Sequence, residues 1–263
     1  MVGGCAMLQS LDRALNMIEY LTTQKSVSIS ELAEKFEVDN STATRIMQTF
    51  AAHDLTKKDP YTQKYSLSNG TLRLSYQVSL NNKIIRIAHP YLERLADVTE
   101  ETSRLCGINK QSIYIIDQVN YGNNAFIHNA DIPGMSKPLY CSAIGKAALA
   151  YLPEEEVKEI FKDIEMRRFT ENTICSLDIL FEQFKQIREN GYALNTAEYI
   201  DRAFCIAAPI FDEQNMPSYA IGISGSTDFR QYPQKYNQIT NYIKEACAVV
   251  TKEYKKYARK KTN

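Results

Sequence analysis

Residues 27–67 read VSISELAEKFEVDNSTATRIMQTFAAHDLTKKDPYTQKYSL and carry the signals of two short helices followed by a hairpin. Ser28 and Glu31 form an S-x-x-E capping box, in which a hydroxyl and a carboxylate each satisfy a free N–H at a helix start. Apolar residues then recur at i, i+3, i+4 and i+7, at Ile29, Leu32, Ala33 and Phe36. A polar break follows, and its candidate N-caps for a second helix are Asp39, Asn40 and Ser41.

The second helix repeats this apolar spacing with Ala43, Ile46, Met47 and Phe50. Since a helix turns by about 100° per residue, the opposite face carries hydrogen-bonding groups and no acid. These groups belong to Ser41, Thr44, Arg45 and Gln48. Two helices joined by a short turn, with an exposed polar half on the second, have the geometry that enters a DNA major groove. The alternative is an ordinary αα-hairpin with a solvated face.

The flanking segments favour the DNA-binding interpretation. Upstream, an amphipathic helix that could complete a three-helix unit is marked by Leu11, Leu15, Ile18 and Leu21. Downstream, short strands at 55–58 and 64–67 flank a turn in which Pro60 can fix φ. A hairpin directly after a recognition helix is a wing, and its lysines suit phosphate contacts. They are Lys57, Lys58 and Lys64. We therefore predict a winged helix-turn-helix over residues 8–69.

The composition is that of a globular protein, with 263 residues, 44% hydrophobic and 24% charged, long enough for one large or two small domains. The net charge is zero, so any contact with nucleic acid must be local. From residue 55 to 86 six cations oppose the single acid Asp59. No apolar run is long enough to span a membrane, and the start lacks a secretory signal. Six scattered cysteines without a C-x-x-C pair indicate reduced thiols, so we expect a cytoplasmic protein without metal or cofactor.

Residues 70–83 are expected to form a linker helix, interrupted near Asn81-Asn82. Its apolar residues are a candidate dimer surface, or serve to dock the linker on its own wing: Leu72, Leu74, Tyr76, Val78 and Leu80. Residues 84–258 contain runs of strands bracketed by helices without regular βαβ alternation. This order predicts an α+β domain around an antiparallel sheet. The expected strands include 112–119, 204–211 and a further one at 125–129, and a helix at 177–190 should end at Gly191.

Three blocks of sequence together resemble the IclR family of bacterial transcription regulators, over residues 8–257. The first is LDRALNMIEYL with SISELAEKFEVDNSTATRIMQTF and KYSLSNG, the second is KPLYCSAIGKAALAYLPEEE, and the third is GYALNTAEY with CIAAPIFDEQ and IGISGS. The resemblance implies a winged helix-turn-helix, a linker helix and a GAF-like domain that binds a small effector. It also implies dimers or tetramers that bind partly palindromic double-stranded DNA operators.

Residues 138–146 independently indicate a pocket, because small residues at a loop that enters a helix leave backbone N–H groups open to a polar or anionic ligand. The resemblance adds positions on the neighbouring strands. The expected effector-binding residues are Ser142, Ala143, Ile144, Asn195, Ala203, Cys205 and Ser224. Taken alone, Cys205 would be read as a small buried hydrophobe. Lys146 is expected to be structural.

The sequence departs from the family pattern at two places. Asn195 stands where the family usually has an acid, and Arg202-Ala203-Phe204 replaces the common Gly-Leu-Arg before the cysteine. A pocket that loses a carboxylate and gains a guanidinium would favour anions, although Arg202 could instead point to solvent. We expect the effector to be a small organic acid or a related metabolite.

Three functions of different classes remain to be distinguished. The leading hypothesis is an effector-controlled transcription regulator, acting more often as a repressor than as an activator. The second is an enzyme with Cys141 or Cys205 as nucleophile, activated by His89 or His128. The third is an architectural DNA-binding protein without a ligand, for which a GAF-like domain would be needless.

Overall fold

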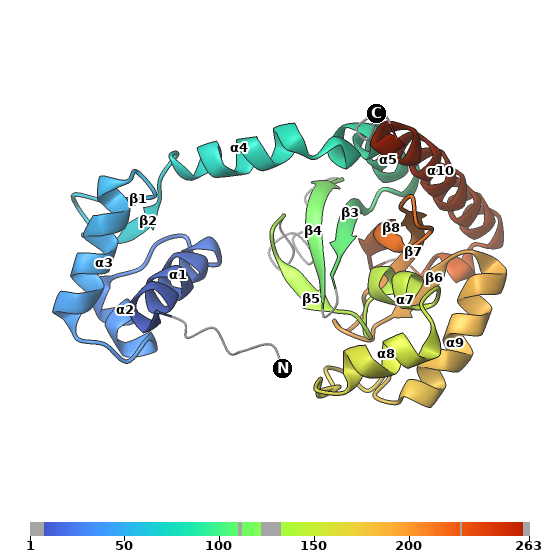
Figure 1. The fold of residues 1–263 in the computed structure, drawn as a ribbon, viewed down its shortest axis with the longest axis horizontal. Coiled ribbons are helices and arrows are strands. Elements are labelled where there is room, and N and C mark those ends of the chain that lie inside the picture. The colour runs from blue at the N-terminus through green and yellow to red at the C-terminus, as the bar shows by residue number, and fades with distance from the viewer. Residues whose placement is uncertain (1–7, 110–111, 122–132, 227, 260–263) are drawn as a thin grey trace. The chain divides into compact units, whose positions relative to one another are not determined.

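The computed structural model describes residues 8–109, 112–121, 133–226 and 228–259. The chain divides into two compact units, Met1–Asn81 and Asn82–Asn263, which are considered separately below. Figure 1 gives the helix and strand labels. The expected strand at 125–129 and the candidate base His128 lie outside the described residues.

The first unit contains the three predicted helices, α1 (Gln9–Thr22), α2 (Ile29–Lys35) and α3 (Asn40–Ala52). The capping box at α2 is formed as expected. The Ser28 N–H donates to the Glu31 carboxylate at 2.6 Å, and the Glu31 N–H donates to the Ser28 hydroxyl at 3.2 Å. Of the three candidate N-caps of α3, Asp39 has this role, since it accepts from the Thr42 N–H at 2.8 Å. Local side-chain chemistry therefore sets both helix starts.

The core of this unit confirms the apolar faces of α2 and α3 but corrects that of α1. Ala43 and Met47 are fully buried, and Ile46 and Phe50 pack beside them. On α1 the core positions are Met17 and Leu21, whereas Leu11 and Leu15 are 54% and 49% exposed. The expected face is confirmed at Leu21, with Ile18 half-buried, and is wrong at Leu11 and Leu15. Periodicity finds an apolar stripe without showing whether the core or the surface lies beside each part of it.

The wing consists of β1 (Thr56–Lys58) and β2 (Tyr65–Leu67), paired antiparallel with Thr56 opposite Leu67. Its turn is held by the Asp59 carboxylate, which accepts from the N–H groups of Tyr61 and Thr62 at 2.9 and 2.7 Å. These bonds hold the pKa of Asp59 below its usual range, the backbone bond from Thr62 being the largest cause. An Asx turn thus fixes the hairpin whose strands the sequence predicted.

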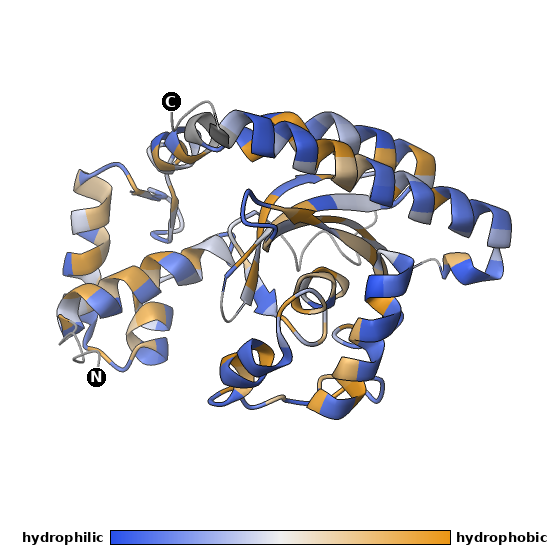
Figure 2. Ribbon diagram, turned by 45° about the vertical axis from the view of Figure 1, so that its right-hand side comes forward, coloured by the Kyte–Doolittle hydropathy of each residue, from blue (hydrophilic) through white to orange (hydrophobic). Residues whose placement is uncertain are grey.

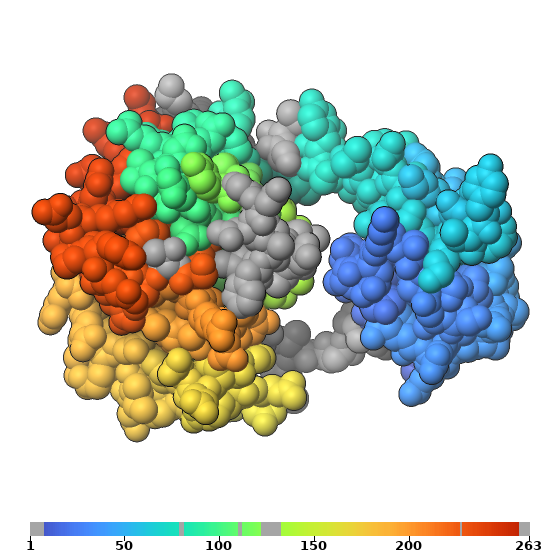
Figure 3. All heavy atoms as spheres, turned by 180° about the vertical axis from the view of Figure 1, so that it is seen from behind, coloured from blue at the N-terminus to red at the C-terminus, as the bar shows by residue number. Residues whose placement is uncertain are grey.

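The linker helix α4 (Thr71–Asn81) ends where the sequence predicted an interruption, and α5 (Lys83–Thr99) begins after it. The apolar residues of α4 do not form one face. They alternate every second position, and two residues turn a helix by about 200°, so Leu72 and Tyr76 lie on one side and Leu74 and Val78 on another. All four are 61–64% exposed, and Figure 3 shows α4 in turquoise at the surface of its unit. The side chain of Leu80 lies outside the described residues.

The second unit is built on a six-stranded antiparallel sheet with strand order β5-β4-β3-β8-β7-β6. The strands are β3 (Thr102–Ile108), β4 (Ser112–Val119), β5 (Ser136–Pro138), β6 (Ala193–Thr196), β7 (Phe204–Phe211) and β8 (Pro217–Gly225). The predicted α+β class is confirmed. The short strand β5 was not predicted.

Helices cover both faces of this sheet (Figure 2). The long helices α5 and α10 (Pro233–Arg259) pack on one face, over a core that includes Leu105, Ile206 and Ile221. On the other face lie α7 (Ala143–Leu149), α8 (Glu154–Phe161) and α9 (Leu177–Asn190). A 3-10 turn, η1 (Phe229–Gln231), precedes α10. The predicted end of α9 is confirmed, because Gly191 is left-handed with φ 78°.

None of the helices within the described ranges combines the length and the apolar character that crossing a membrane requires.

Candidate functional site

The polar face of α3 is exposed, as its helical spacing requires. Ser41, Arg45 and Gln48 are exposed and Thr44 is half-buried. The Ser41 hydroxyl donates to the Asp39 carboxylate, and the Thr44 hydroxyl donates to the Asn40 carbonyl at 2.7 Å. The bonds from Ser41 and Thr42 hold the pKa of Asp39 well below its usual range, so this carboxylate stays charged. Ser41 and Thr44 therefore keep only acceptor lone pairs, while Arg45 and Gln48 supply the donors of this face.

The three wing lysines differ in their surroundings. Lys57 and Lys58 are neighbours on β1, so their side chains leave opposite faces of the hairpin. The Lys58 ammonium lies 5.8 Å from the ring of the buried Tyr65, whose backbone is its partner across the hairpin. The Lys64 ammonium lies 3.6 Å from the carboxylate of Glu31, the capping-box acid of α2. Lys57 is thus the lysine that points away from the core, while Lys64 ties the wing to α2.

Tyr61, which is 94% exposed at the tip of the wing, was not among the predicted DNA-binding residues. The Asp59 turn holds the backbone of this residue, so the ring projects from a fixed loop. The pair Pro60-Tyr61 in the turn could have predicted this exposed ring, because a large aromatic residue at a hairpin tip has no core to contact.

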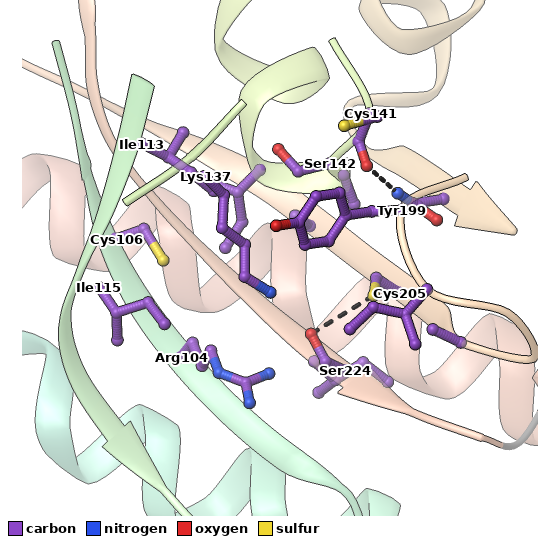
Figure 4. A pocket seen from close by; sticks show the side chains of 17 residues that line it. Arg104, Cys106, Ile113, Ile115, Lys137, Cys141, Ser142, Tyr199, Cys205 and Ser224 are labelled. Atoms are coloured by element: carbon purple, nitrogen blue, oxygen red, sulfur yellow. Dashed lines mark hydrogen bonds between the residues drawn. The ribbon is translucent and has the colours of Figure 1, made fainter. Parts of the chain in front are cut away.

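In the second unit, all seven residues expected to bind an effector line one cavity between the sheet and α7 (Figure 4). They are Ser142, Ala143, Ile144, Asn195, Ala203, Cys205 and Ser224. The cavity has a volume of about 50 Å³. One water occupies about 10–15 Å³ on this measure, so the space suits a few waters or one compact ligand.

Small side chains keep this cavity open. Cys205 is paired with Ser224 on β8 and Ala207 with Gly222, so the floor has little bulk. A Cβ on Gly222 would lie 2.5 Å from the Ile206 carbonyl oxygen, which explains the glycine there. The Cys205 thiol donates to the Ser224 hydroxyl at 3.4 Å.

The start of α7 forms the upper wall. Ser142 is its N-cap, and its hydroxyl accepts from the Gly145 N–H at 3.0 Å. The N–H groups of Ala143 and Ile144 occupy the first helical positions, for which a helix has no acceptor of its own. Gly145 allows the close packing that this wall needs, since a Cβ there would lie 2.1 Å from the Leu139 carbonyl oxygen.

Asn195 is buried, and its side chain holds the loop that leads into α7. Its amide donates to the Cys141 carbonyl at 2.5 Å, and its side-chain oxygen accepts from the Glu198 N–H at 3.1 Å. A carboxylate at this position could accept but not donate, so it would lose the first bond. The neutral amide thus joins the end of β6 to the loop before α7 without adding charge to the cavity.

Two cations that the sequence interpretation missed also line the cavity, Arg104 from β3 and Lys137 from β5. Arg104 is only 3% exposed, and Figure 4 shows its guanidinium and the Lys137 ammonium pointing into the same space. The Lys137 ammonium lies 5.3 Å from the ring of Tyr199, another lining residue. Strand alternation could have predicted the position of Arg104. Leu105 packs in the core on one face of the sheet, so its neighbours Arg104 and Cys106 point to the opposite face, which lines the cavity.

Arg202, by contrast, does not contribute its guanidinium to the cavity. It is exposed in the loop between β6 and β7, with φ 63°, and is not a lining residue. Its left-handed backbone turns the chain between two strands and directs the side chain to solvent. The alternative that Arg202 points to solvent is therefore confirmed, and the guanidinium that lines the cavity is that of Arg104.

Lys146 has the structural role that the sequence predicted. Its ammonium is buried, at 2.5 Å from the Glu198 carboxylate and 2.9 Å from the side-chain oxygen of Gln183 on α9. Burial raises the pKa of Glu198, while the ammonium opposes that rise. The pair fixes α7 against the loop after β6 and does not line the cavity.

The Cys141 thiol is buried and is not poised for nucleophilic catalysis. Burial raises the pKa of Cys141 to about 12, so its thiol stays protonated at neutral pH. His89 lies on α5, across the sheet from the cavity, and its Nδ1 is 2.7 Å from the Asp117 carboxylate. His89 therefore cannot activate Cys141 or Cys205.

A unit with a recognition helix and wing, joined to an α+β unit with a ligand-sized cavity, defines a DNA-binding regulator with a sensory domain. Comparison with known families agrees. The C-terminal domain of IclR bacterial transcriptional regulators matches residues 77–251, and the IclR helix-turn-helix domain matches residues 10–60. The chain therefore belongs to the IclR family and is a transcription regulator, not an enzyme.

Individual relatives support this assignment. The chain is 30% identical over 220 residues to the HTH-type transcriptional regulator BhcR of Paracoccus denitrificans, covering 84% of this chain and 78% of BhcR. It is equally identical to the regulator KdgR of Escherichia coli K12, over 84% of this chain and 83% of KdgR. The crystal structure of the Thermotoga maritima IclR is 27% identical with a TM-score of 0.78, covering 94% of this chain and 99% of that one.

Replacing Asn195 with Asp should destabilise the protein by about 1–3 kcal/mol at pH 7, because the bond to Cys141 is lost and a carboxylate is buried. Burial raises the pKa of such an Asp in the folded state above about 3.9, so the penalty grows as pH rises and shrinks toward pH 4. Urea unfolding at the two pH values measures it. The exposed Asn172→Asp is the control, and equal stability of both variants at pH 7 would contradict the assigned role of Asn195.

Proposed function

We propose that this regulator is a repressor whose affinity for its operator is set by a small organic acid bound in the cavity. The observation that carries the proposal is the convergence of all seven expected positions on one cavity that also holds Arg104 and Lys137. An architectural DNA-binding protein would have no use for such a cavity. A ligand can shift the affinity only if it binds the DNA-competent and the released arrangements with different strength.

DNA recognition divides into base contacts and phosphate contacts. Arg45 and Gln48 carry the donors of the exposed face of α3, and Ser41 and Thr44 add acceptors. Among the wing lysines, Lys57 is the best placed for a phosphate, and Lys58 and Lys64 complete a positive edge. Base contacts specify the sequence, while phosphate contacts add affinity without selectivity.

Self-association is the second part of the proposal. The first unit carries exposed apolar residues at Leu8, the N-cap of α1, at Leu11 and Leu15 on α1, and on both sides of α4. A single module with few cations has a small contact area, and two linked modules gain affinity on paired half-sites. We infer a dimer or a tetramer that covers these residues.

Repression is favoured over activation by the relatives, since AllR of Salmonella typhimurium and IclR of Escherichia coli are both named transcriptional repressors. Because a regulator of this kind must reach the chromosome, we place it in the cytoplasm.

Arg45→Ala should weaken binding to the true operator by about 1–3 kcal/mol and relax its selectivity, because a bidentate base contact is removed. Lys57→Ala should weaken binding to all sequences alike and lower the slope of affinity against salt by about one. Fluorescence anisotropy with operator and random DNA across a salt series separates the two. The control is Lys162→Ala in the second unit, which matches the change in charge. An Arg45→Ala protein with full selectivity would remove Arg45 from the reading face.

The double variant Leu72→Glu/Tyr76→Glu should weaken self-association by at least about tenfold, because each side chain loses an apolar contact worth about 1.5–3 kcal/mol. Sedimentation measures the association. Ile179→Glu, at an apolar position on α9 that is 54% exposed, is the control. A wild-type monomer that binds a half-site at nanomolar concentration would contradict the dimer.

Cys205→Phe should fill the cavity and abolish the response to effector while leaving operator affinity in the absence of effector unchanged. The measurement is release of a genomic fragment selected by the wild-type protein, in the presence of cell metabolites. Cys205→Ser keeps the space and should keep the response. If the Phe variant responds with an unchanged midpoint, the effector binds elsewhere.

A further inference from the structure

The second unit carries a positively charged groove that neither effector binding nor the winged helix-turn-helix explains. We propose that this groove, between α5 and α10, binds the phosphate backbone of the double-stranded DNA that flanks the operator. The inference rests on the DNA binding that membership of the family implies, and it requires neither the effector nor a particular oligomer.

The groove follows one side of each of two helices that pack together, as Figure 1 shows near the C-terminal end of the chain. On α5 its lining includes Lys83, Arg86 and Tyr91, at i, i+3 and i+8. On α10 it includes Glu253, Lys256 and Tyr257, at i, i+3 and i+4. The groove is open to solvent and has a volume of about 690 Å³, against about 50 Å³ for the cavity beside α7. Such a groove suits the surface of a macromolecule better than a small metabolite.

Three cations line this groove against one acid. They are Lys83, Arg86 and Lys256, and Glu253 is the single Asp or Glu among the described lining residues. Arg86 and Lys256 are exposed, and Lys83 is half-buried. Within the described part of the chain, none of the three cations forms an ion pair with a carboxylate. Their charge is therefore available to an anionic partner.

Helix stability does not account for the cations of α5. Lys83 is its first residue and Arg86 its fourth, where the helix dipole disfavours positive charge, and no acid in the first turn offsets them. The Lys83 ammonium lies 3.3 Å from the centroid of the Tyr257 ring, a contact that orients the ammonium and keeps its charge. Lysine, arginine and tyrosine side chains all contact phosphates in protein–DNA complexes. The groove combines all three.

The chain keeps this groove close to the DNA-binding unit. The helix α4 follows the wing and is 11 residues long, so it spans about 16 Å. Only Asn82 separates α4 from Lys83, the first residue of the groove. One turn of DNA measures about 34 Å, so the groove begins within about one turn of the wing. Tethering at this distance gives a high effective concentration of the DNA that α3 and the wing hold. An acidic protein would match the charge as well, but this proximity favours DNA.

The test is the salt dependence of binding to a genomic fragment that the full-length wild-type protein selects, measured by fluorescence anisotropy. The variant Lys83→Gln/Arg86→Gln/Lys256→Gln should lower the slope of log affinity against log salt by about two to three, because each phosphate contact contributes about 0.9. Affinity at about 0.1 M salt should fall at least about tenfold. A wild-type slope in this variant would overturn the proposal.

The matched control is Lys158→Gln/Lys162→Gln/Lys185→Gln. It makes the same change in charge at exposed positions of α8 and α9 and should leave the slope unchanged. An equal loss of slope in the control would overturn the proposal, because the effect would then reflect net charge and not the groove.

Trimming the DNA locates the contact. Removing the flanks of the fragment should weaken wild-type binding and lower its slope before the operator itself is cut, whereas the triple Gln variant of the groove should be unaffected over that range. Hydroxyl-radical footprinting of the untrimmed fragment should show flanking backbone protected by the wild type and not by the variant. Identical responses of the two proteins would place the contact elsewhere.

A variant that retains the charges guards against a folding defect. Lys83→Arg/Arg86→Lys/Lys256→Arg should bind with the wild-type slope. If it loses as much slope as the Gln variant while both unfold at the wild-type temperature, charge is not what the groove supplies, and the phosphate contact is overturned. If sedimentation shows that the Gln variant loses self-association with its slope unchanged, the groove binds a second copy of the chain, which also overturns the proposal.

Failure of this inference is distinguishable from failure of the proposed function. The flank contact is measured without any small molecule, and Cys205→Phe should leave it unchanged. A missing effector response therefore leaves the flank contact standing, and an unchanged salt slope leaves effector control standing.

Discussion

The buried ion pair between Lys146 and Glu198 joins two segments that line the cavity, α7 and the loop after β6, and its ammonium also binds α9. Lys146 belongs to α7, Glu198 to the loop after β6, and the same ammonium also binds Gln183 on α9. The loop is tied further by the Thr173 hydroxyl, which donates to the Glu198 carbonyl at 2.7 Å. Losing one partner would leave a buried charge, at a cost of about 3–5 kcal/mol. Tyr199 and Ala203, which line the cavity, keep their places because this loop is fixed.

Much of the fold was predictable because its signals are local. The strand 204–211 alternates and ends at a turn, and the helix 177–190 ends at a glycine, so both were placed at their observed bounds. The strand β5 was missed because three residues, Ser-Lys-Pro, carry no apolar pattern. On α1, Leu11 and Leu15 were predicted to share the core face with the buried Leu21, because spacing alone does not reveal where along a helix the core ends.

The candidate site was predictable only in part, for a similar reason. The seven expected positions come from a motif and from three adjacent strands that follow one another in the chain, β6, β7 and β8. Arg104 and Lys137 are brought together by non-local pairing, β3 with β4 and β4 with β5, which no short motif encodes. Arg202 was the nearest guanidinium in sequence, but its turn directs it to solvent. Sequence proximity was therefore a poor guide to charge in the cavity.

The two faces of the sheet differ in how tightly they are packed. The face toward α5 and α10 is packed with large side chains such as Phe204, Ile206 and Ile221. The opposite face carries Cys205, Ala207 and Gly222 at the neighbouring positions, and these small residues leave the hollow that a ligand can enter. A cavity lowers the free energy of unfolding, because the side chains around it lose packing contacts. Alternation lets one strand supply both surfaces, so the packed face can support a hollow one.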